Sequence, residues 1–459
     1  MRVESVSNTF EASIKPQKNK KKKVLYGAAA AAIIAAGVTA SIILAGRKKP
    51  DKYLVELAQC LSKELNKTVK PSELDSVMTK EEFLREIPKL KEENFVASVE
   101  NIKNGTFIAD LHSHSNFSDG RLSVQEIMEQ AANYGDKINS INGKKFIFAI
   151  TDHDGVGGVK EALKIIAENP EKFKNVKFVP AAELSFIESC SFDSVRFGKY
   201  HSDVQMPEML IYNLNPFSEN TEKYFSNLYG NRKKLTQNMI DRANNDFGGY
   251  NFSLQEFEQF ADKSQGKYCL LNHHWNVHDY LQLKTRLVDI AREQKKDEKQ
   301  FFEETIQALA DARRTPNGLS KYLKERNIET TTPETYDRVT NLSREFFPKN
   351  ENGIAKSAYE NTFDDIANFA LKEHSYLAFA HPGFTMQNFS EGECYSKMRS
   401  YIMRSKGTLR FVEKFHQAYP FGTNIEREEL GKYHKILDEF NLFNLGGRDN
   451  HSNNFTDFK

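Results

Sequence analysis

The sequence predicts an α/β protein in which strands and helices alternate around a barrel. Three observations lead to this prediction: short apolar runs recur along the chain, helical patterns separate them, and polar side chains follow directly after several of the runs. Barrels of this kind place their chemistry at the carboxyl ends of the strands, which is where these polar side chains fall. The expected strands lie at residues 106–112, 145–152, 176–183, 209–214, 376–381, 408–415 and 442–447.

Size and composition set the limits of the fold. A chain of 459 residues with 39% hydrophobic content can bury a large core and still carry additions. The formal net charge of +1 gives no sign of a protein that binds polyanions over its whole surface. The cysteines lie far apart and form no Cys-x-x-Cys pair, so we expect neither a disulfide framework nor a zinc knuckle. They are Cys60, Cys190, Cys269 and Cys394.

The start of the chain predicts a tail and a membrane anchor. Residues 1–23 are polar and rich in lysine, as in a disordered basic tail. Residues 24–46 carry no charge, and a helix of this length, at about 1.5 Å per residue, spans a hydrocarbon core about 30 Å thick. We expect a single-pass membrane protein. Basic residues flank the anchor on both sides, so the sequence does not indicate on which side of the membrane the rest of the chain lies. The alternatives are a signal peptide cleaved near residues 38–40 and an alanine-rich soluble helix.

Residues 47–105 show helical patterns without residues for catalysis. Leu54, Leu57 and Leu61 follow the period of an amphipathic helix. Thr79 and Glu82 have the spacing of a capping box, in which the two side chains satisfy free amides at the start of a helix. We expect this segment to form a stalk or to cover the bottom of the barrel.

The first predicted strand is followed by the residues around which the others are arranged. His112 and His114 are one residue apart, so on a strand both imidazoles point to one face and toward a common metal. Asp119 adds an acidic oxygen, and Gly120 allows a tight turn before a helix that begins near Leu122. A pair of surface histidines is the alternative, and the recurrence of the same arrangement downstream argues against it.

Later apolar runs end in the same way. Two of them finish on His153 and His381, a third ends in Glu183, and the last leads to Asp449 and His451. Imidazoles and carboxylates that converge at one rim form a mixed nitrogen and oxygen site, which suits Zn, Mn or Fe.

In their order along the chain, these segments resemble the polymerase and histidinol phosphatase family, known as PHP. The motifs that carry the resemblance are Asp-Leu-His-x-His-Ser-x-x-Ser-Asp-Gly at 110–120, Thr-Asp-His-Asp at 151–154, a strand-end Glu at 183, Ala-His-Pro at 380–382 and Gly-x-Asp-x-His at 447–451. The resemblance covers residues 106–459 and implies a distorted seven-stranded TIM-like barrel that holds two or three divalent metal ions. The metal ligands that it implies are His112, His114, Asp119, His153, Glu183, His381, Asp449 and His451.

The resemblance also implies an activity, the hydrolysis of a phosphoester. Neighbouring cations would lower the pKa of a bridging water, and the metal-activated hydroxide would attack phosphorus without a covalent nucleophile on the protein. The substrate would be a phosphorylated small molecule, a nucleotide or a short nucleic acid. The alternative is a membrane-tethered domain that binds a metal or a ligand without turnover. No protein partner can be inferred from the sequence.

The candidates for catalysis are Glu183, Asp152 and Arg448, and Asp154 is expected to share the role of Asp152. Glu183 is expected to bridge two cations. Asp152 and Asp154 flank His153 and are expected to orient imidazoles. Arg448 either clamps a phosphate or turns away into a salt bridge.

One position departs from the family pattern. Leu210 stands where members with three metals carry a histidine. Three consequences are compatible with this departure: a metal with an open coordination position, compensation by His201 on the preceding loop, or the loss of one metal.

A long segment separates the fourth and fifth predicted strands. Residues 217–360 exceed what a crossover helix needs, and they predict a mostly helical inserted subdomain. His273 and His274 lie in this insertion, beside Trp275 and His278. In a lid over the barrel these histidines would contact substrate. In the alternative they are surface histidines around a packed aromatic cluster.

Overall fold

The structure of the protein is a computed structural model, and it describes residues 50–95, 106–186, 188–189, 204–205, 207–264, 275–311, 361–382, 391–416, 435 and 437–451. The predicted tail and anchor, residues 1–46, lie outside the described residues, as do His201, His273 and His274. Among the helices that the structure describes, none is long and apolar enough to cross a membrane.

Seven strands form one curved sheet in the described part of the chain. The edge strands of this sheet meet, because the Leu111 amide donates to the Gly446 carbonyl at 3.2 Å and the Asp449 amide donates to the His112 carbonyl at 2.9 Å. The sheet is therefore a nearly closed barrel, and the predicted seven-stranded α/β barrel is confirmed. Its strands are, in sheet order, β1 (Ala109–Asp110), β2 (Phe146–Ile150), β3 (Val176–Ser185), β6 (Glu208–Tyr212), β7 (Tyr376–Phe379), β8 (Leu409–His416) and β9 (Phe443–Gly447).

Strand β6 runs against its neighbours. It pairs antiparallel with β3 and with β7, whereas the pairs β1–β2, β2–β3, β7–β8 and β8–β9 are parallel. Ser185, at the carboxyl end of β3, pairs with Glu208, at the amino end of β6. The rim that holds the carboxyl ends of the parallel strands therefore holds the amino end of β6. A separate antiparallel pair, β4 (Glu188–Ser189) and β5 (Val204–Gln205), lies between β3 and β6 in the sequence.

Apolar side chains at alternate strand positions fill the barrel core. Because alternate residues face the same side, the core takes two residues or so from each strand and leaves the rim to polar groups. The strand residues and their neighbours in this core are Ala109, Leu111, Ile147, Ala149, Val179, Ala181, Leu210, Tyr212, Ala378, Ala380, Phe411 and Leu445.

Helices that precede β1 close the other end of the barrel. The capping box at the start of α3 is present, since the Thr79 hydroxyl accepts from the Glu82 amide and the Glu82 carboxylate accepts from the Thr79 amide, both at 3.1 Å. The Phe83 ring of α3 lies with its centroid 5.1 Å from those of Tyr212 and Phe411, inside the barrel core. The helices at this end are α3 (Lys80–Glu86), η2 (Ile87–Lys89) and η3 (Glu92–Asn94). The preceding helices, α2 (Lys52–Glu64) and η1 (Pro71–Leu74), pack against α6 (Gly157–Glu168) on the outside of the sheet.

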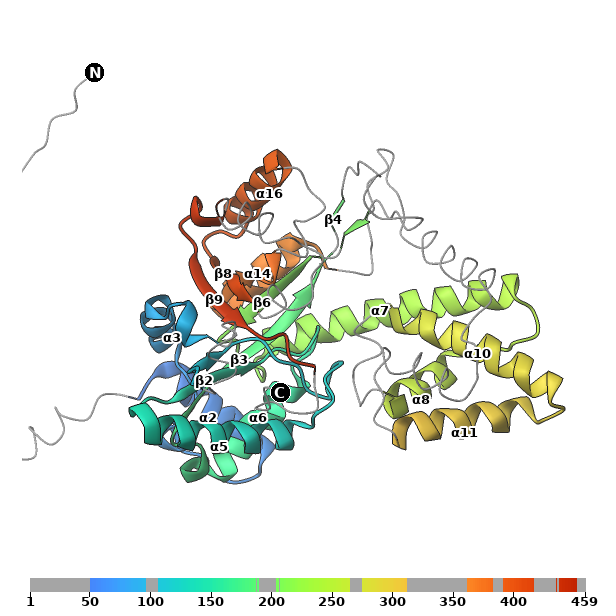
Figure 1. The fold of residues 1–459 in the computed structure, drawn as a ribbon, viewed down its shortest axis with the longest axis horizontal. Helices are drawn as coiled ribbons and strands as arrows, with labels where there is room; N and C mark the ends of the chain where they lie inside the picture. The colour runs from blue at the N-terminus through green and yellow to red at the C-terminus, as the bar shows by residue number, and fades with distance from the viewer. Residues whose placement is uncertain are drawn as a thin grey trace, which may run out of the picture. The chain divides into compact units, whose positions relative to one another are not determined.

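Further helices cover the outside of the sheet (Figure 1). The first of them begins where expected, since the Ser123 side chain accepts from the Glu126 amide at 3.2 Å, and it ends at Gly143, whose φ of +70° suits glycine. Figure 1 shows α5 and α6 side by side along β2 and β3. The outer elements are α5 (Val124–Asn142), α6 (Gly157–Glu168), η4 (Pro170–Phe173), α14 (Phe363–Glu373) and α16 (Glu391–Arg404).

The inserted segment contains four described helices: α7 (Glu219–Asp246), α8 (Leu254–Ser264), α10 (Trp275–Glu293) and α11 (Glu298–Asp311). They share a core of their own, which includes Ile240, Phe257, Tyr280 and Leu287. The first turns of α7 pack elsewhere, because the Tyr224 ring stacks on Phe369 of α14 with centroids 4.1 Å apart. Helix α7 therefore belongs both to the outer layer of the barrel and to the inserted helices.

Candidate metal centre

All eight predicted metal ligands meet at the rim where the parallel strands end, and a ninth residue, Glu208, joins them. Their donor atoms form three overlapping groups, and within each group the atoms lie within 4.8 Å of one another. The first group is His114, Asp119, His153 and His451; the second is His112, His114, Glu183 and Asp449; the third is His153, Glu183 and Glu208. His381 lies beside the third group, with Nε2 at 3.1 Å from Glu183 and 3.2 Å from Glu208.

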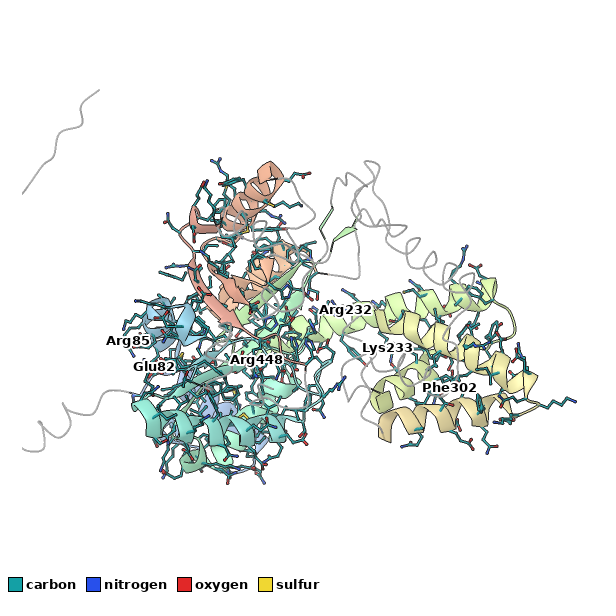
Figure 2. The ribbon with its side chains drawn as sticks, viewed as in Figure 1. Glu82, Arg85, Arg232, Lys233, Phe302 and Arg448 are labelled. Carbon is teal, nitrogen blue, oxygen red and sulfur yellow. The ribbon has the colours of Figure 1, made fainter. Side chains whose placement is uncertain are left out.

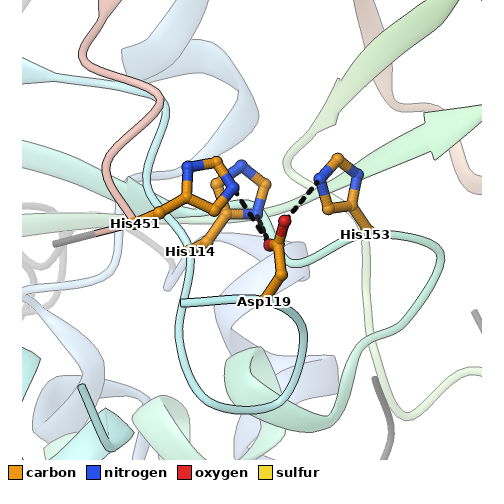
Figure 3. A group of neighbouring side chains, drawn as sticks. All are labelled: His114, Asp119, His153 and His451. Atoms are coloured by element: carbon orange, nitrogen blue, oxygen red, sulfur yellow. Dashed lines mark ion pairs between the residues drawn. The ribbon is translucent and has the colours of Figure 1, made fainter. Parts of the chain in front are cut away.

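The first group surrounds the carboxylate of Asp119 (Figure 3). His451 Nε2 lies 3.0 Å from Asp119 Oδ1, and His114 Nδ1 lies 3.7 Å from the same oxygen. His153 Nε2 lies 3.7 Å from Oδ2. The rings of His114 and His451 are stacked, with centroids 4.2 Å apart. Three imidazoles from three separate segments of the chain thus point at one carboxylate.

The second group brings two imidazole nitrogens face to face. His112 Nε2 and His114 Nε2 are 3.1 Å apart. Glu183 Oε2 lies 3.1 and 3.3 Å from these two nitrogens, and Asp449 Oδ1 lies 3.4 and 3.0 Å from them. Several lone pairs that point at one place are typical of a cation site. A site made of imidazoles and carboxylates suits Zn, Mn or Fe. The residues present therefore fit divalent metal ions.

The third group corrects the interpretation of strand β6. Leu210 was expected at a ligand position, but it is fully buried in the barrel core. Glu208, two residues earlier on the same face, reaches the rim instead, with Oε1 at 3.6 Å from His153 Nδ1. Because β6 is antiparallel, the residue nearest the rim is its first and not its last.

Glu413 is a functional candidate that the sequence analysis missed. Both of its carboxylate oxygens lie 3.0 Å from Nδ1 of His112, and one accepts from the His381 amide at 2.9 Å. A carboxylate at Nδ1 holds the imidazole so that Nε2 can face a metal. Its signal in the sequence was an acidic residue in the same register as the apolar Leu409 and Phe411 of β8.

Asp152 was predicted to orient imidazoles, and it acts on His114 indirectly, through Ser118. Its carboxylate accepts from the Ser115 amide and hydroxyl, both at 2.7 Å, and from the Ser118 hydroxyl at 2.8 Å. The Ser118 oxygen in turn lies 3.3 Å from His114 Nδ1. Asp152 therefore shapes the loop that carries His114 and Asp119.

Arg448 adopts the second of its two predicted alternatives. Its Nε donates to Asp110 Oδ2 at 2.6 Å and its amide donates to Asp110 Oδ1 at 3.1 Å, with both side chains buried. The ion pair joins β1 to the residue after β9 and so ties the seam of the barrel.

Glycines let the backbone pass close to two of the ligands. A Cβ on Gly447 would lie 2.4 Å from His112 Cβ, and one on Gly120 would lie 2.3 Å from the His114 carbonyl oxygen. Contacts this short exclude any side chain, so glycine is required at both positions.

Three rim residues have left-handed backbone conformations. The φ angles of Asp154, His381 and Asp449 are +48°, +22° and +51°. Residues other than glycine rarely adopt such angles, and those that do gather at functional sites, where the surrounding structure holds them.

Mutual electrostatics hold the cluster together. Burial alone would lower the pKa of His114, but hydrogen bonds to Asp449 and Glu183 outweigh it and raise the pKa to about 10. Burial would raise the pKa of Glu183, yet His112 and His153 hold it well below its usual range. A cation that binds imidazole nitrogen must therefore displace protons from the cluster.

No protein-family model matches the chain, and no curated protein is similar to it. One similar solved structure is an amidohydrolase from Chromobacterium violaceum with bound sulfate and no metal: 16% identity, a TM-score of 0.41, and coverage of 75% of this chain and 88% of that one. Another, from Bifidobacterium adolescentis, is provisionally described as a metal-dependent phosphoesterase, with 17% identity, a TM-score of 0.41, and coverage of 75% and 87%. Likenesses at this level carry no inference about the function of this chain.

Proposed function

We propose that the protein is a metal-dependent phosphoesterase that cleaves a phosphomonoester or phosphodiester. The observation that supports this proposal is the convergence of five imidazoles and four carboxylates on one rim, in overlapping groups that suit two or three divalent cations. The motifs that carry these side chains resemble those of the PHP family, whose members hydrolyse phosphoesters. Mn, Zn and Fe are the candidate metals.

The residues of the site have separate tasks in this reaction. When bound, divalent cations supply Lewis acidity, which lowers the pKa of water and offsets charge on phosphoryl oxygens. Glu183 contributes to two of the three donor groups and so sets the distance between them. Glu413 fixes the orientation of the His112 ring, and Asp152 fixes the loop of His114.

The second candidate is a membrane-tethered domain that binds a metal or a ligand without turnover. The feature that supported this candidate was Leu210, because a leucine at a ligand position would leave a metal centre with too few ligands. Glu208 supplies a carboxylate at the same rim, and this removes the reason to expect a degenerate site. Hydrolysis is therefore the preferred function.

The test uses the full chain purified in detergent. Metal content is measured first, and then the hydrolysis of an aryl phosphate, a bis-aryl phosphate and a dinucleotide with added Mn, Zn or Fe. We expect hydrolysis of at least one class and its loss in Glu183→Gln. Tight metal binding without hydrolysis of any substrate would favour the second candidate, and absence of metal binding would contradict the proposed metal-dependent hydrolysis.

Two further features of the proposal rest on sequence alone. We propose that residues 24–46 anchor the protein in a lipid bilayer and that its substrate is a phosphorylated small molecule or a short nucleic acid. Deletion of residues 1–50 is expected to release an equally active protein into the soluble fraction. A deletion variant that stays with the membrane, or that fails to fold, would contradict the anchor.

A further inference from the structure

A buried ion pair connects an inserted helix to the rim. Arg232 of α7 donates through Nη1 to Asp154 Oδ2 at 2.8 Å, and the two side chains are 4% and 0% exposed. Figure 2 labels Arg232 on this helix. A buried charge is stable only while its partner is in place, so each member of such a pair fixes the position of the other.

Asp154 also holds the ends of two strands together. Its amide donates to the Glu183 carbonyl at 2.7 Å, and its Oδ1 accepts from the Ser185 amide at 3.0 Å. It directly follows His153, which bridges to Glu183 through the backbone. One aspartate thus joins the segment after β2, the end of β3 and, through Arg232, helix α7.

The residues that Asp154 braces are the ones that the metal centre shares. His153 belongs to the first and third donor groups, and Glu183 belongs to the second and third. Every group therefore contains His153, Glu183 or both. A shift of Asp154 would change the spacing of donor atoms in all three.

We propose that Arg232 is a positioning residue of the metal centre, through which α7 holds His153 and Glu183 at the spacing that binds a cation. This inference rests on the proposed metal-dependent function. It gives the inserted helices a task at the rim that needs no contact between them and the substrate. Loss of the guanidinium leaves the Asp154 carboxylate buried with one charge partner removed, and the carboxylate then moves toward water or toward the imidazoles.

The neighbouring residue provides a matched control. Lys233 lies next to Arg232 on α7 (Figure 2) and forms an ion pair with Glu258 of α8. Its side chain is 42% exposed, and its partner belongs to the inserted helices. Lys233→Ala removes a cation and an ion pair from the same helix without touching Asp154.

The experiment measures Mn²⁺ affinity and stoichiometry of the full chain by electron paramagnetic resonance, at a temperature where circular dichroism shows every variant to be folded. Replacing a residue that orients metal ligands typically weakens binding about 10–100-fold, and we expect this range for Arg232→Ala. Arg232→Lys keeps the charge and is expected to recover part of the affinity. Lys233→Ala should stay within about twofold of the unmodified protein.

A double variant and the control separate the possible results. Arg232→Ala combined with Asp154→Asn is expected to bind Mn²⁺ better than Arg232→Ala alone, because no unpaired buried carboxylate remains. Unchanged affinity in Arg232→Ala and Arg232→Lys, or an equal loss in Lys233→Ala, would overturn the inference and leave the proposed function intact. Absence of Mn²⁺ binding in the unmodified protein would overturn the proposed metal centre itself.

Discussion

The inserted helices and the barrel rim both bury charged groups, but the partners of these groups differ between the two regions. Among the helices, Lys284 donates to the Asn251 carbonyl at 2.7 Å and to Glu256 Oε1 at 2.5 Å. Its ammonium also lies 5.7–6.0 Å from the ring centroids of Phe252, Tyr280 and Phe302. The Lys284 ammonium thus lies among hydrogen-bond acceptors and aromatic faces, so its buried charge is satisfied within the inserted helices.

At the rim, the atoms that could bind a metal face one another. His112 Nε2 faces His114 Nε2 at 3.1 Å, and the rings of His114 and His153 stack with centroids 4.5 Å apart. Carboxylates such as Glu183 and Asp449 attract these imidazoles, but the approach of one imidazole nitrogen to another in a buried place is costly in a purely structural network. Buried charge therefore has two roles here: the Lys284 network stabilises the fold, and the convergent groups at the rim could hold a metal ion.

The largest expected effect separates the two regions by function. Glu183→Gln keeps the shape of the side chain and removes a charge shared by two donor groups. We expect hydrolysis and Mn²⁺ affinity to fall by about 100-fold or more. The matched variant Glu256→Gln, in the network of Lys284, should leave both unchanged. Equal losses in the two variants would mean that the Lys284 network also supports the metal centre.

A second variant tests the corrected register of β6. Leu210→His places an imidazole in the apolar barrel core, so it should lower the free energy of unfolding by about 2–4 kcal/mol without adding a metal. Urea denaturation and metal analysis measure the two quantities. Glu208→Gln should do the reverse, with weaker metal binding and little loss of stability. Greater metal retention in Leu210→His would restore the original interpretation.

A smaller effect is expected within the inserted helices. Lys284→Met keeps the length of the side chain but leaves Glu256 and the Asn251 carbonyl without the ammonium. The free energy of unfolding should fall by about 1–3 kcal/mol, measured by urea denaturation. Metal content and the Mn²⁺ affinity should not change. A loss of bound metal would show that this network also supports the rim.

The last effect, small for each pH unit, concerns pH. The pKa of His114 is raised to about 10, so without metal its protonation contributes stability that is complete below its unfolded pKa of about 6.5 and is lost as pH rises through about 10. A bound cation competes with the same proton, so stabilisation by Mn²⁺ should grow with pH. Thermal melts at several pH values, with and without Mn²⁺, measure both slopes. The slope from one such group is at most about 1.4 kcal/mol per pH unit. Parallel curves would rule out the coupling.

The sequence predicted the ligands whose signal is local. His112, His114 and Glu183 follow apolar runs directly, and this pattern needs no knowledge of the rest of the fold. Glu208 was missed because the direction of β6 depends on its pairing with β3 and β7, which a single strand does not reveal. Glu413 was missed because an acidic residue inside a strand is usually a solvent-facing one.

The alternatives that the sequence left open depended on long-range contacts. Arg448 and its partner Asp110 are separated by most of the chain, so only the closed barrel shows that they pair. The ion pair between Arg232 and Asp154 is of the same kind, because it joins an inserted helix to a strand end. Spacing along the chain carries no information about either pair.

The seam between β1 and β9 has a consequence for the order in which the protein matures. Strand β1 and His112 leave the ribosome long before β9, Asp449 and His451, by an interval on the order of half a minute at common rates of synthesis. Until β9 docks, the edge of β1 stays open and the second donor group lacks its aspartate. A nascent or truncated chain therefore cannot assemble the full set of metal-binding side chains, and the site is complete only when the last strand of the sheet has closed.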